Sequence, residues 1–438
     1  MKKTIVLLGV GSTYFTKGIV ESLIRNGGEW DLRLVDIDEK CVDIAVNLAN
    51  RIVNKYNALV KVTGTTERKD VLAGADAVVS TIGVGGRVAW EKDLTVFNKF
   101  DIYPCTGDTF GVAGVSRALR TVPVLIEIAR DMEKLCPNAL FVNFANPMTV
   151  NCWALNKATK IKTIGLCYGI TYFQHYLAEF IGVPFEETWA KAIGTNHFSW
   201  ITDFHYDGKD AWPLVYDKMK EKNKEISDNP YTWDLFQTFD AFPCVGDGHI
   251  CEFIPGFEKK GAYYGKTFGF DGGHNNNDYL RYWDKVFQDT TDQAYGKQPL
   301  EEIEGFIEGN NVFRDEDLFI DVLTASMGGK PVERTVNIPN QGQVSSLPLG
   351  AVLEGTTLVN GAGFHPLSYG ELPAGINAIL LRILGAQALT VEAALNADRK
   401  LIVQALMADL TAIRKADAEK LVDCILETHK EYLPQFYK

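Results

Sequence analysis

Apolar residues in the first third of the chain occur as short continuous runs separated by stretches with helical spacing. KTIVLL (residues 3–8) is one run, TKGIVESLIRN (16–26) has the periodicity of a helix, and DLRLV (31–35) is a second run. A continuous run of roughly four to eight apolar residues is typical of a strand buried on both faces. The pattern therefore predicts a strand, a helix and a second strand of an α/β fold.

Two further apolar runs, ADAVVS (75–80) and NALFVNF (138–144), extend this alternation. Strands that alternate with helices predict a parallel sheet with right-handed crossovers, and ligands bind at the carboxyl ends of such strands. We predict an α/β protein with a Rossmann-type, doubly wound parallel sheet in residues 1–193. An α+β domain for substrate binding and oligomerisation is expected in residues 194–438, as in lactate and malate dehydrogenases. From about Glu371, helical spacing predicts long amphipathic scaffold helices.

The first strand runs directly into a glycine-rich turn, and the second ends in an acid. Glycines let the backbone approach a pyrophosphate, and Asp36 is placed to bind ribose hydroxyls and to repel a 2′-phosphate. Tyr14 stands where the third glycine of GxGxxG would be, so the turn alone is a weak signal. We expect NAD rather than NADP. The expected cofactor contacts are Gly9, Gly11, Ser12, Thr13, Asp36, Ser80, Thr81, Ile82 and Gly83.

Composition narrows the class of protein. The chain has 438 residues, 46% of them hydrophobic and 23% charged, and a formal net charge of −12. Such a negative charge argues against nucleic acid and anionic membranes as partners. The apolar run at the N-terminus is too short for a signal peptide, and no stretch suggests a membrane span. The eight cysteines form no paired framework. We expect an acidic cytoplasmic enzyme.

A polar, glycine-containing loop, CTGDTFGVAG (105–114), leads into a helical stretch. Asp108 and Arg120 come from this region, and Asn146 follows the strand at 138–144 in an Asn-Pro step. A loop of this kind is suited to holding a polar substrate above a nicotinamide. The helical apolar spacing from residue 116 to 135 otherwise indicates scaffold.

Cys167 and His197 each end a short apolar run. They could be buried core residues, a nucleophile with its base, or two ligands of a divalent transition metal. Spacing alone favours the first possibility. A third polar segment, CVGDGHICE (244–252), has glycines on either side of Asp247 and next to His249. Its Cys244, His249 and Cys251 would also permit a structural zinc.

Taken together, these motifs resemble glycoside hydrolase family 4, the NAD- and metal-dependent glycosidases, over essentially the whole chain. The segments that carry the resemblance are GVGSTYF, LRLVDID, GDTFGVAG, NFANPM, IGLCYG, GTNHFSW and LTVEAALNADRKL. The resemblance implies hydrolysis by NAD-mediated oxidation at sugar C3, metal-assisted removal of the C2 proton, elimination of the leaving group, addition of water and re-reduction. The family is an exception to two-carboxylate glycoside hydrolysis.

The same resemblance implies roles for individual residues. Cys167 and His197 would bind the metal, usually Mn²⁺, and Asn146, Asp108 and Arg120 would bind the sugar. Tyr168 stands where the family's leaving-group acid is expected, although Tyr departs from the family's usual residues there. The C2 base would be Asp247, with His249 and Tyr263 as alternatives.

The loop GDTFGVAG differs from the loop of phospho-specific members, so we expect a non-phosphorylated α-galactoside, α-glucoside or α-hexuronide as substrate. A 6-phospho-glycoside is the alternative within the family. The alternative outside it is a 2-hydroxy-acid dehydrogenase of the lactate or malate type, in which Cys167 would have no role. The resemblance also favours a homodimer or homotetramer.

Overall fold

One continuous sheet runs through the described parts of the computed structural model, which are residues 2–222, 228–269, 276–303, 315–409 and 414–437. Within these ranges it holds thirteen strands, and its main path has the order β10-β8-β7-β12-β11-β6-β5-β4-β1-β2-β3. The strands are β1 Lys3–Leu8, β2 Trp30–Val35, β3 Val60–Thr65, β4 Ala77–Ser80, β5 Leu140–Asn143, β6 Thr163–Gly165, β7 Thr188–Thr195, β8 Phe198–Tyr206, β9 Lys209–Asp210, β10 Phe242–Cys244, β11 Val332–Pro339, β12 Val352–Asn360 and β13 Gly363–Pro366.

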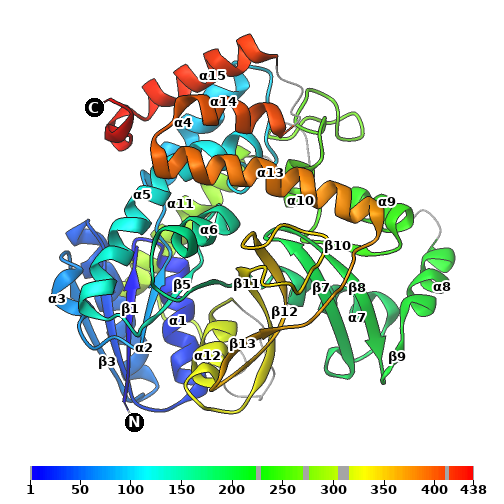
Figure 1. Cartoon of the computed structure of the whole chain (residues 1–438). Helices are drawn as coiled ribbons and strands as arrows, with labels where there is room; N and C mark the ends of the chain where they lie inside the picture. The colour runs from blue at the N-terminus through cyan, green and yellow to red at the C-terminus, as the bar shows by residue number, and fades with distance from the viewer. Residues whose placement is uncertain (1, 223–227, 270–275, 304–314, 410–413, 438) are drawn as a thin grey trace.

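The helices cover both faces of this sheet (Figure 1). They are α1 Thr13–Asn26, α2 Glu39–Lys55, α3 Lys69–Leu72, α4 Gly86–Asn98, α5 Gly111–Leu135, α6 Met148–Ala158, α7 Gly169–Ile181, α8 Trp212–Lys222, α9 Pro230–Phe239, α10 Asp247–Phe253, α11 Asn276–Ala294, α12 Asp315–Ser326, α13 Ala374–Asn396, α14 Arg399–Ala408 and α15 Lys415–Thr428.

The N-terminal half of the sheet is the predicted parallel unit. Strands β3, β2, β1, β4, β5 and β6 lie side by side and each pairs in parallel with its neighbour. Strands β1 and β4 are almost wholly buried, as their continuous apolar runs predict. The α/β class and the Rossmann-type topology are confirmed.

The remaining strands continue the same sheet in antiparallel order. β11 pairs with β6 through Asn337 and Gly165, and β12, β7, β8 and β10 follow. Strand β7 crosses residue 193, where we expected a domain boundary, and both of its partners lie in the second part of the chain. The division at residue 193 stays a prediction.

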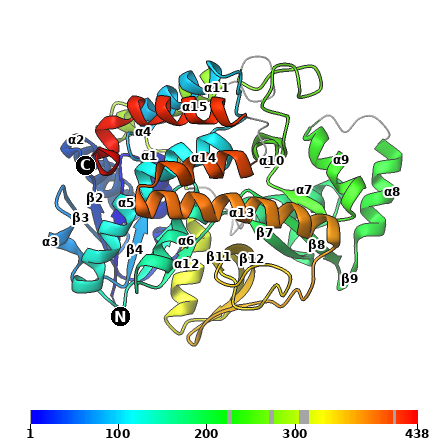
Figure 2. The same cartoon turned by 45° about the horizontal axis from the view of Figure 1, so that its top comes forward.

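Helices from the second half also complete the layers of the first half. α11 packs against α2 and α1, and α12 packs against α1. On the other side α13 packs against α5 and α6, and α15 packs against α4; Figure 2 shows α13, α14 and α15 lying over α5 and α4. The predicted amphipathic C-terminal helices are therefore scaffold for the parallel unit itself.

Helix α13 qualifies our expectation that no stretch could span a membrane. It is the one helix in the described ranges that is long and apolar enough, by length and composition, to do so. About half of its apolar window is buried, and Ile376, Leu380 and Ile383 lie in a core cluster. Packing inside the protein thus accounts for the buried half of this window.

Candidate active site

The glycine turn after β1 and the acid after β2 meet at the carboxyl edge of the sheet. Gly9 has a φ of +89°, and a Cβ there would lie 3.1 Å from the Ile82 Cα. The backbone N–H of Gly11 donates to Asp36 Oδ2 at 2.8 Å. The predicted ribose acid therefore lies against the predicted phosphate turn. Their roles as cofactor contacts stay predictions.

The segment after β4 lies against the same turn. Thr81 Oγ1 donates to the carbonyl oxygens of Leu8 and Gly9, at 3.2 and 3.0 Å. Ser80 Oγ is buried and has no hydrogen-bond partner among the described residues. Thr13 differs from these predicted contacts, because its hydroxyl lies 2.7 Å from that of Thr290 on α11 and so joins two helices.

A second polar group unites three segments that are far apart in the sequence. Asp108 precedes α5, His197 lies in the two-residue turn between β7 and β8 with a φ of +67°, and His249 lies in α10. Each of the three offers a potential ligand atom, and these atoms lie within 4.8 Å of one another. The rings of His197 and His249 have centroids 4.0 Å apart. Carboxylate and imidazole together suit a divalent transition metal.

Thr109 connects two members of this group through its hydroxyl. Its Oγ1 donates to Asp108 Oδ1 and lies 2.8 Å from His197 Nδ1. Because the single hydroxyl proton goes to the carboxylate, Nδ1 of His197 must carry the proton of their shared hydrogen bond. Nε2 of His197 is then the nitrogen with a free lone pair, which is the tautomer a metal ligand requires.

The charges in the group also suit a cation. Burial alone would raise the pKa of the Asp108 carboxyl, but the charge of Arg117 and the imidazoles of His249 and His197 lower it to about 2. Burial, together with His249, lowers the pKa of His197 to about 3, although Asp108 opposes this. At neutral pH the group therefore contains an anionic carboxylate and a neutral His197 imidazole.

Asn146 completes one side of the group. Its Nδ2 donates to Asp108 Oδ2 at 3.0 Å. Its Oδ1 is buried and, within the described ranges, accepts no hydrogen bond. A buried acceptor with no partner beside an anion is an arrangement that a bound cation or a sugar hydroxyl would satisfy.

The structure brings Arg117 to the group and places Arg120 elsewhere. Arg117 Nη1 lies 3.9 Å from Asp108 Oδ2. Arg120 is buried between α4 and α5, where its Nη2 donates to Asp93 Oδ2 at 2.7 Å. Asp93 also pairs with His429 at 2.7 Å. Arg120 is therefore paired with Asp93 inside the protein. It lies about one helical turn from Arg117, which is the arginine that reaches Asp108.

Cys167 lies at the carboxyl end of the strand next to the one that leads to Asn146. The N–H of Gly169 donates to Cys167 Sγ at 3.4 Å, and Tyr168 lies at the start of α7. A Cβ on Gly169 would lie 1.9 Å from Val245 Cγ1, so this turn packs directly on the segment that leads into α10. Cys167 is not among the three residues of that group, Asp108, His197 and His249. Its role as a ligand, like that of Tyr168 as an acid, stays a prediction.

Asp247 is hydrogen-bonded both to α9 and to Tyr263. The Asp247 carboxylate accepts hydrogen bonds from the N–H groups of Tyr231 and Thr232 and from the Thr232 hydroxyl, at 2.7 to 2.9 Å. Tyr263 donates its hydroxyl to the same carboxylate at 2.6 Å. Of the three residues considered as the base, only His249 lies in the group with His197. His249 groups there rather than with Cys244 and Cys251, which removes the structural zinc hypothesis.

Sequence reasoning missed two residues near this group. Burial and then the charge of Asp108 raise the pKa of Tyr279 on α11, whereas Arg117 lowers it, so Tyr279 lies within electrostatic range of both. Glu252, one helical turn after His249, binds the backbone of the Asp108 loop. The signal available for Glu252 was its i, i+3 spacing from His249 in GDGHICEF.

Comparison with known proteins decides the family. The profile described as "Family 4 glycosyl hydrolase" matches residues 4–183, and that of the family's C-terminal domain matches residues 192–412. The chain belongs to family 4 of the glycosyl hydrolases. The α-galacturonidase of Thermoanaerobacterium saccharolyticum is 30% identical, over 98% of this chain and 96% of its own. The α-galactosidase of Bacillus subtilis is 27% identical, over 99% of this chain and all of its own.

Family 4 membership agrees with the fold. A 6-phospho-α-glucosidase from gut microorganisms, solved in complex with NAD and Mn²⁺, superposes with a TM-score of 0.83 at 18% identity, covering 99% of each chain. Malate dehydrogenase from Plasmodium falciparum superposes with a TM-score of 0.52 at 14% identity, over 90% of this chain and 98% of its own. The predicted family and the predicted dehydrogenase-like architecture are both confirmed.

Proposed function

We propose that this family 4 enzyme hydrolyses a non-phosphorylated α-galactoside, α-glucoside or α-hexuronide with the help of NAD⁺ and a divalent metal, in the first instance Mn²⁺. One juxtaposition carries the proposal. Arg117 lies between the segment after β4 and the polar group, since a Cβ on Gly83 would lie 3.6 Å from its Nη2 and its Nη1 is 3.9 Å from Asp108. A sugar held at Asp108 would thus lie beside the cofactor segment.

The residues present fit both cofactors. For NAD⁺, the crowded backbone at Gly9 and the Gly11–Asp36 hydrogen bond provide a turn without side chains next to a ribose acid. For the metal, the neutral His197, the ionised Asp108 and the unpaired Asn146 Oδ1 are hard or borderline donors. We assign the metal to His197 together with Cys167, as the family resemblance implies, with Asp108 and His249 as the residues whose potential ligand atoms group with His197.

When bound, NAD⁺ would supply a hydride acceptor for the sugar C3, and the metal would supply positive charge to stabilise the anion that develops beside it. The protein's own groups then orient the sugar and move protons. Asn146 and Asp108 provide an amide and a carboxylate for sugar hydroxyls. Arg117, near Asp108, offers a cation for a hexuronide carboxylate, whereas Arg87 is already paired with Glu91 and Asp284.

The base that removes the C2 proton is proposed to come from the start of α10, which holds Asp247 and His249. The ring of His249 already lies against the ring of His197 in the structure. Asp247 would have to give up bonds to α9 and Tyr263 before it could act. Tyr168, at the start of α7 beside Cys167, is the proposed leaving-group acid.

The relatives named above support an α-glycosidase acting on a galactoside or a galacturonide. The direct test is a panel of nitrophenyl α-galactoside, α-glucoside, α-galacturonide and 6-phospho-glucoside, assayed with and without NAD⁺, Mn²⁺ and thiol. The proposal requires release of nitrophenol from a non-phosphorylated α-substrate only when NAD⁺ and Mn²⁺ are both present. A preference for the 6-phosphate would move the assignment within the family. Steady accumulation of NADH with a 2-hydroxy acid would indicate a dehydrogenase instead.

A further inference from the structure

A carboxylate with no part in the proposed mechanism lies directly beneath the loop that carries Asp108 and Thr109. Glu252 is only 2% exposed and belongs to α10. Its Oε1 accepts the backbone N–H of Thr106 at 3.1 Å and that of Gly107. Its Oε2 accepts the N–H groups of Thr109 and Phe110, both at 3.3 Å. Four backbone donors of one loop therefore converge on one carboxylate.

Burial and the charge of Asp108 raise the pKa of Glu252 to about 8, although the N–H groups of Gly107, Phe110 and Thr109 lower it. What the arrangement requires in either protonation state is a side chain with two acceptor oxygens. An uncharged amide of the same shape offers one acceptor oxygen and would turn its own N–H groups toward the other two donors. The loop is thus shaped around Glu252 in particular.

Two other contacts also hold the loop, one with α10 and one with Trp90 on α4. Thr106 Oγ1 donates to the Gly248 carbonyl oxygen at 2.7 Å, and Trp90 Nε1 donates to the Thr106 carbonyl oxygen at 3.2 Å. Because α10 also carries His249, a carboxylate on α10 that binds the loop sets the position of Asp108 relative to His249. No hydrogen bond of Glu252 reaches the glycine turn that follows β1 in the described structure.

We propose that Glu252 is a positioning residue, which binds the backbone of residues 106–110 and thereby holds Asp108 and Thr109 in register with His197 and His249. The inference rests on the proposed metal-dependent function and adds a residue to it. Glu252 touches neither substrate nor metal in this account. It acts through the loop, so its loss changes the metal site while leaving the cofactor site intact.

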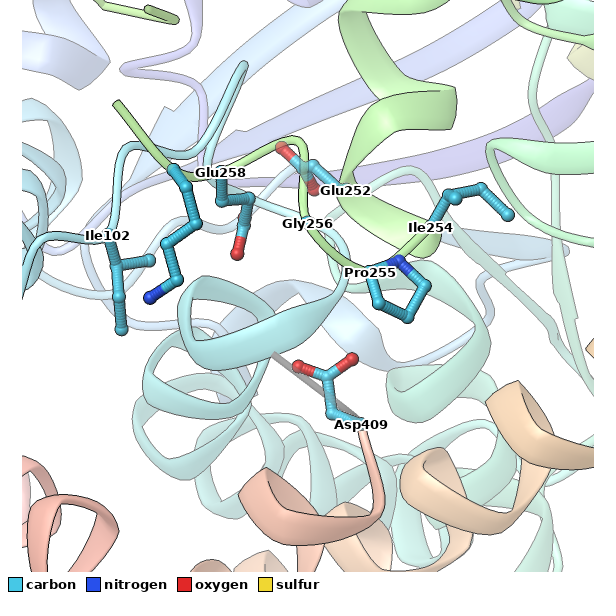
Figure 3. A pocket seen from close by; sticks show the side chains of 8 residues that line it. Ile102, Glu252, Ile254, Pro255, Gly256, Glu258 and Asp409 are labelled. Carbon is cyan, nitrogen blue, oxygen red and sulfur yellow. The ribbon is translucent and has the colours of Figure 1, made fainter. Parts of the chain in front are cut away.

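Glu258 provides a matched control that separates the proposed role of Glu252 from the general effect of replacing a buried acid. Glu258 lines the same pocket as Glu252 and Asp409 (Figure 3) and is also buried, at 5% exposure. Its carboxylate oxygens accept no hydrogen bond from the described residues, so it does not bind the loop. Replacing Glu258 by Gln therefore changes a buried acid in the same place without touching residues 106–110.

The experiment compares the full-length wild type, E252Q and E258Q by Mn²⁺ titration, NAD⁺ titration and amide hydrogen exchange of the peptide containing residues 106–110. We expect E252Q to weaken Mn²⁺ binding by about 10- to 100-fold, as loss of supporting residues does at other metal sites. We expect its loop amides to exchange at least about tenfold faster while the Kd for NAD⁺ stays unchanged. E258Q should match the wild type in all three measurements.

Wild-type Mn²⁺ affinity together with wild-type loop exchange in E252Q would overturn the proposal. Should E252Q fail to bind NAD⁺ and so prove misfolded, E252D takes its place. It keeps the carboxyl group but is one methylene shorter, and unchanged Mn²⁺ affinity and exchange in that variant would overturn the proposal equally. If the wild type itself binds no Mn²⁺, the proposed function fails, and the exchange comparison alone decides whether Glu252 holds the loop.

Discussion

Replacing Thr109 by Val tests whether one hydroxyl sets the tautomer of His197. Val has nearly the same shape, but it removes the donor to Asp108 and the acceptor for His197 Nδ1. His197 is buried, so its Nδ1–H would lose its partner at a cost of about 1–3 kcal/mol. Either Nδ1 keeps its proton without a partner, which costs this free energy, or the proton moves to Nε2. In the second case Nε2 has no lone pair for a metal.

Both outcomes weaken metal binding. Loss of the group that orients a metal-ligating imidazole typically costs about 10- to 100-fold in affinity, which corresponds to roughly 1.4–2.7 kcal/mol. We therefore expect the Kd for Mn²⁺, measured by calorimetry or electron paramagnetic resonance, to rise by that factor in T109V. The Kd for NAD⁺ should not change, because Thr109 makes no hydrogen bond to the glycine turn.

The matched control is T121V. Thr121 is also fully buried and lies on the helix that follows the loop, but its hydroxyl has no hydrogen-bond partner among the described residues. T121V should bind Mn²⁺ like the wild type. Equal Mn²⁺ affinity in T109V and T121V would refute the tautomer argument.

Three further predictions follow from the same geometry. C167S should lose Mn²⁺-dependent activity and keep NAD⁺ binding, whereas C424S, at an exposed cysteine, should change neither; full activity in C167S would remove Cys167 from the metal site. G9A should weaken NAD⁺ binding at least about tenfold, because the added Cβ meets the Ile82 backbone. G27A is the control and should bind NAD⁺ normally, because Gly27 also has a positive φ but a Cβ there would have no neighbour within 4 Å. Since burial lowers the pKa of His197 to about 3, the unfolded chain binds more protons between about pH 6.5 and 3, and stability falls as pH falls through that window. The free energy of unfolding of the metal-free protein, measured with denaturant, should therefore fall with falling pH by up to about 1.4 kcal/mol per pH unit more in the wild type than in H197Q. Identical slopes in the two proteins would contradict this.

Local patterns in the sequence were sufficient to predict the parallel half of the fold. The runs that became β1, β2, β4 and β5 are buried on both faces, so their apolar character is continuous and easily recognised. The antiparallel extension was harder to foresee, because β11 joins β6 through a single paired position, Asn337 with Gly165. No local signal in either segment specifies that contact.

The site was predictable residue by residue only where a backbone element fixes the direction of a side chain. His197 lies in a tight turn and Asn146 follows a strand end, and both came to the polar group. Arg120 and Arg117 lie three positions apart on α5, and helical rotation decided which one met Asp108 and which one met Asp93. The role of Glu252 was not predicted, because its partners are backbone N–H groups. Every residue except proline has such a group, so the sequence of the loop gives no sign of the contact.

The central claim is that hydrolysis proceeds through oxidation at C3 and loss of the C2 proton. The most direct measurement is hydrolysis of the best nitrophenyl α-glycoside or uronide in D₂O with NAD⁺ and Mn²⁺, followed by mass spectrometry and proton NMR of the released sugar. We expect one deuterium at C2, no net NADH, and no hydrolysis when either NAD⁺ or Mn²⁺ is omitted. A sugar released with its C2 proton intact, at a rate indifferent to NAD⁺ and Mn²⁺, would contradict the account.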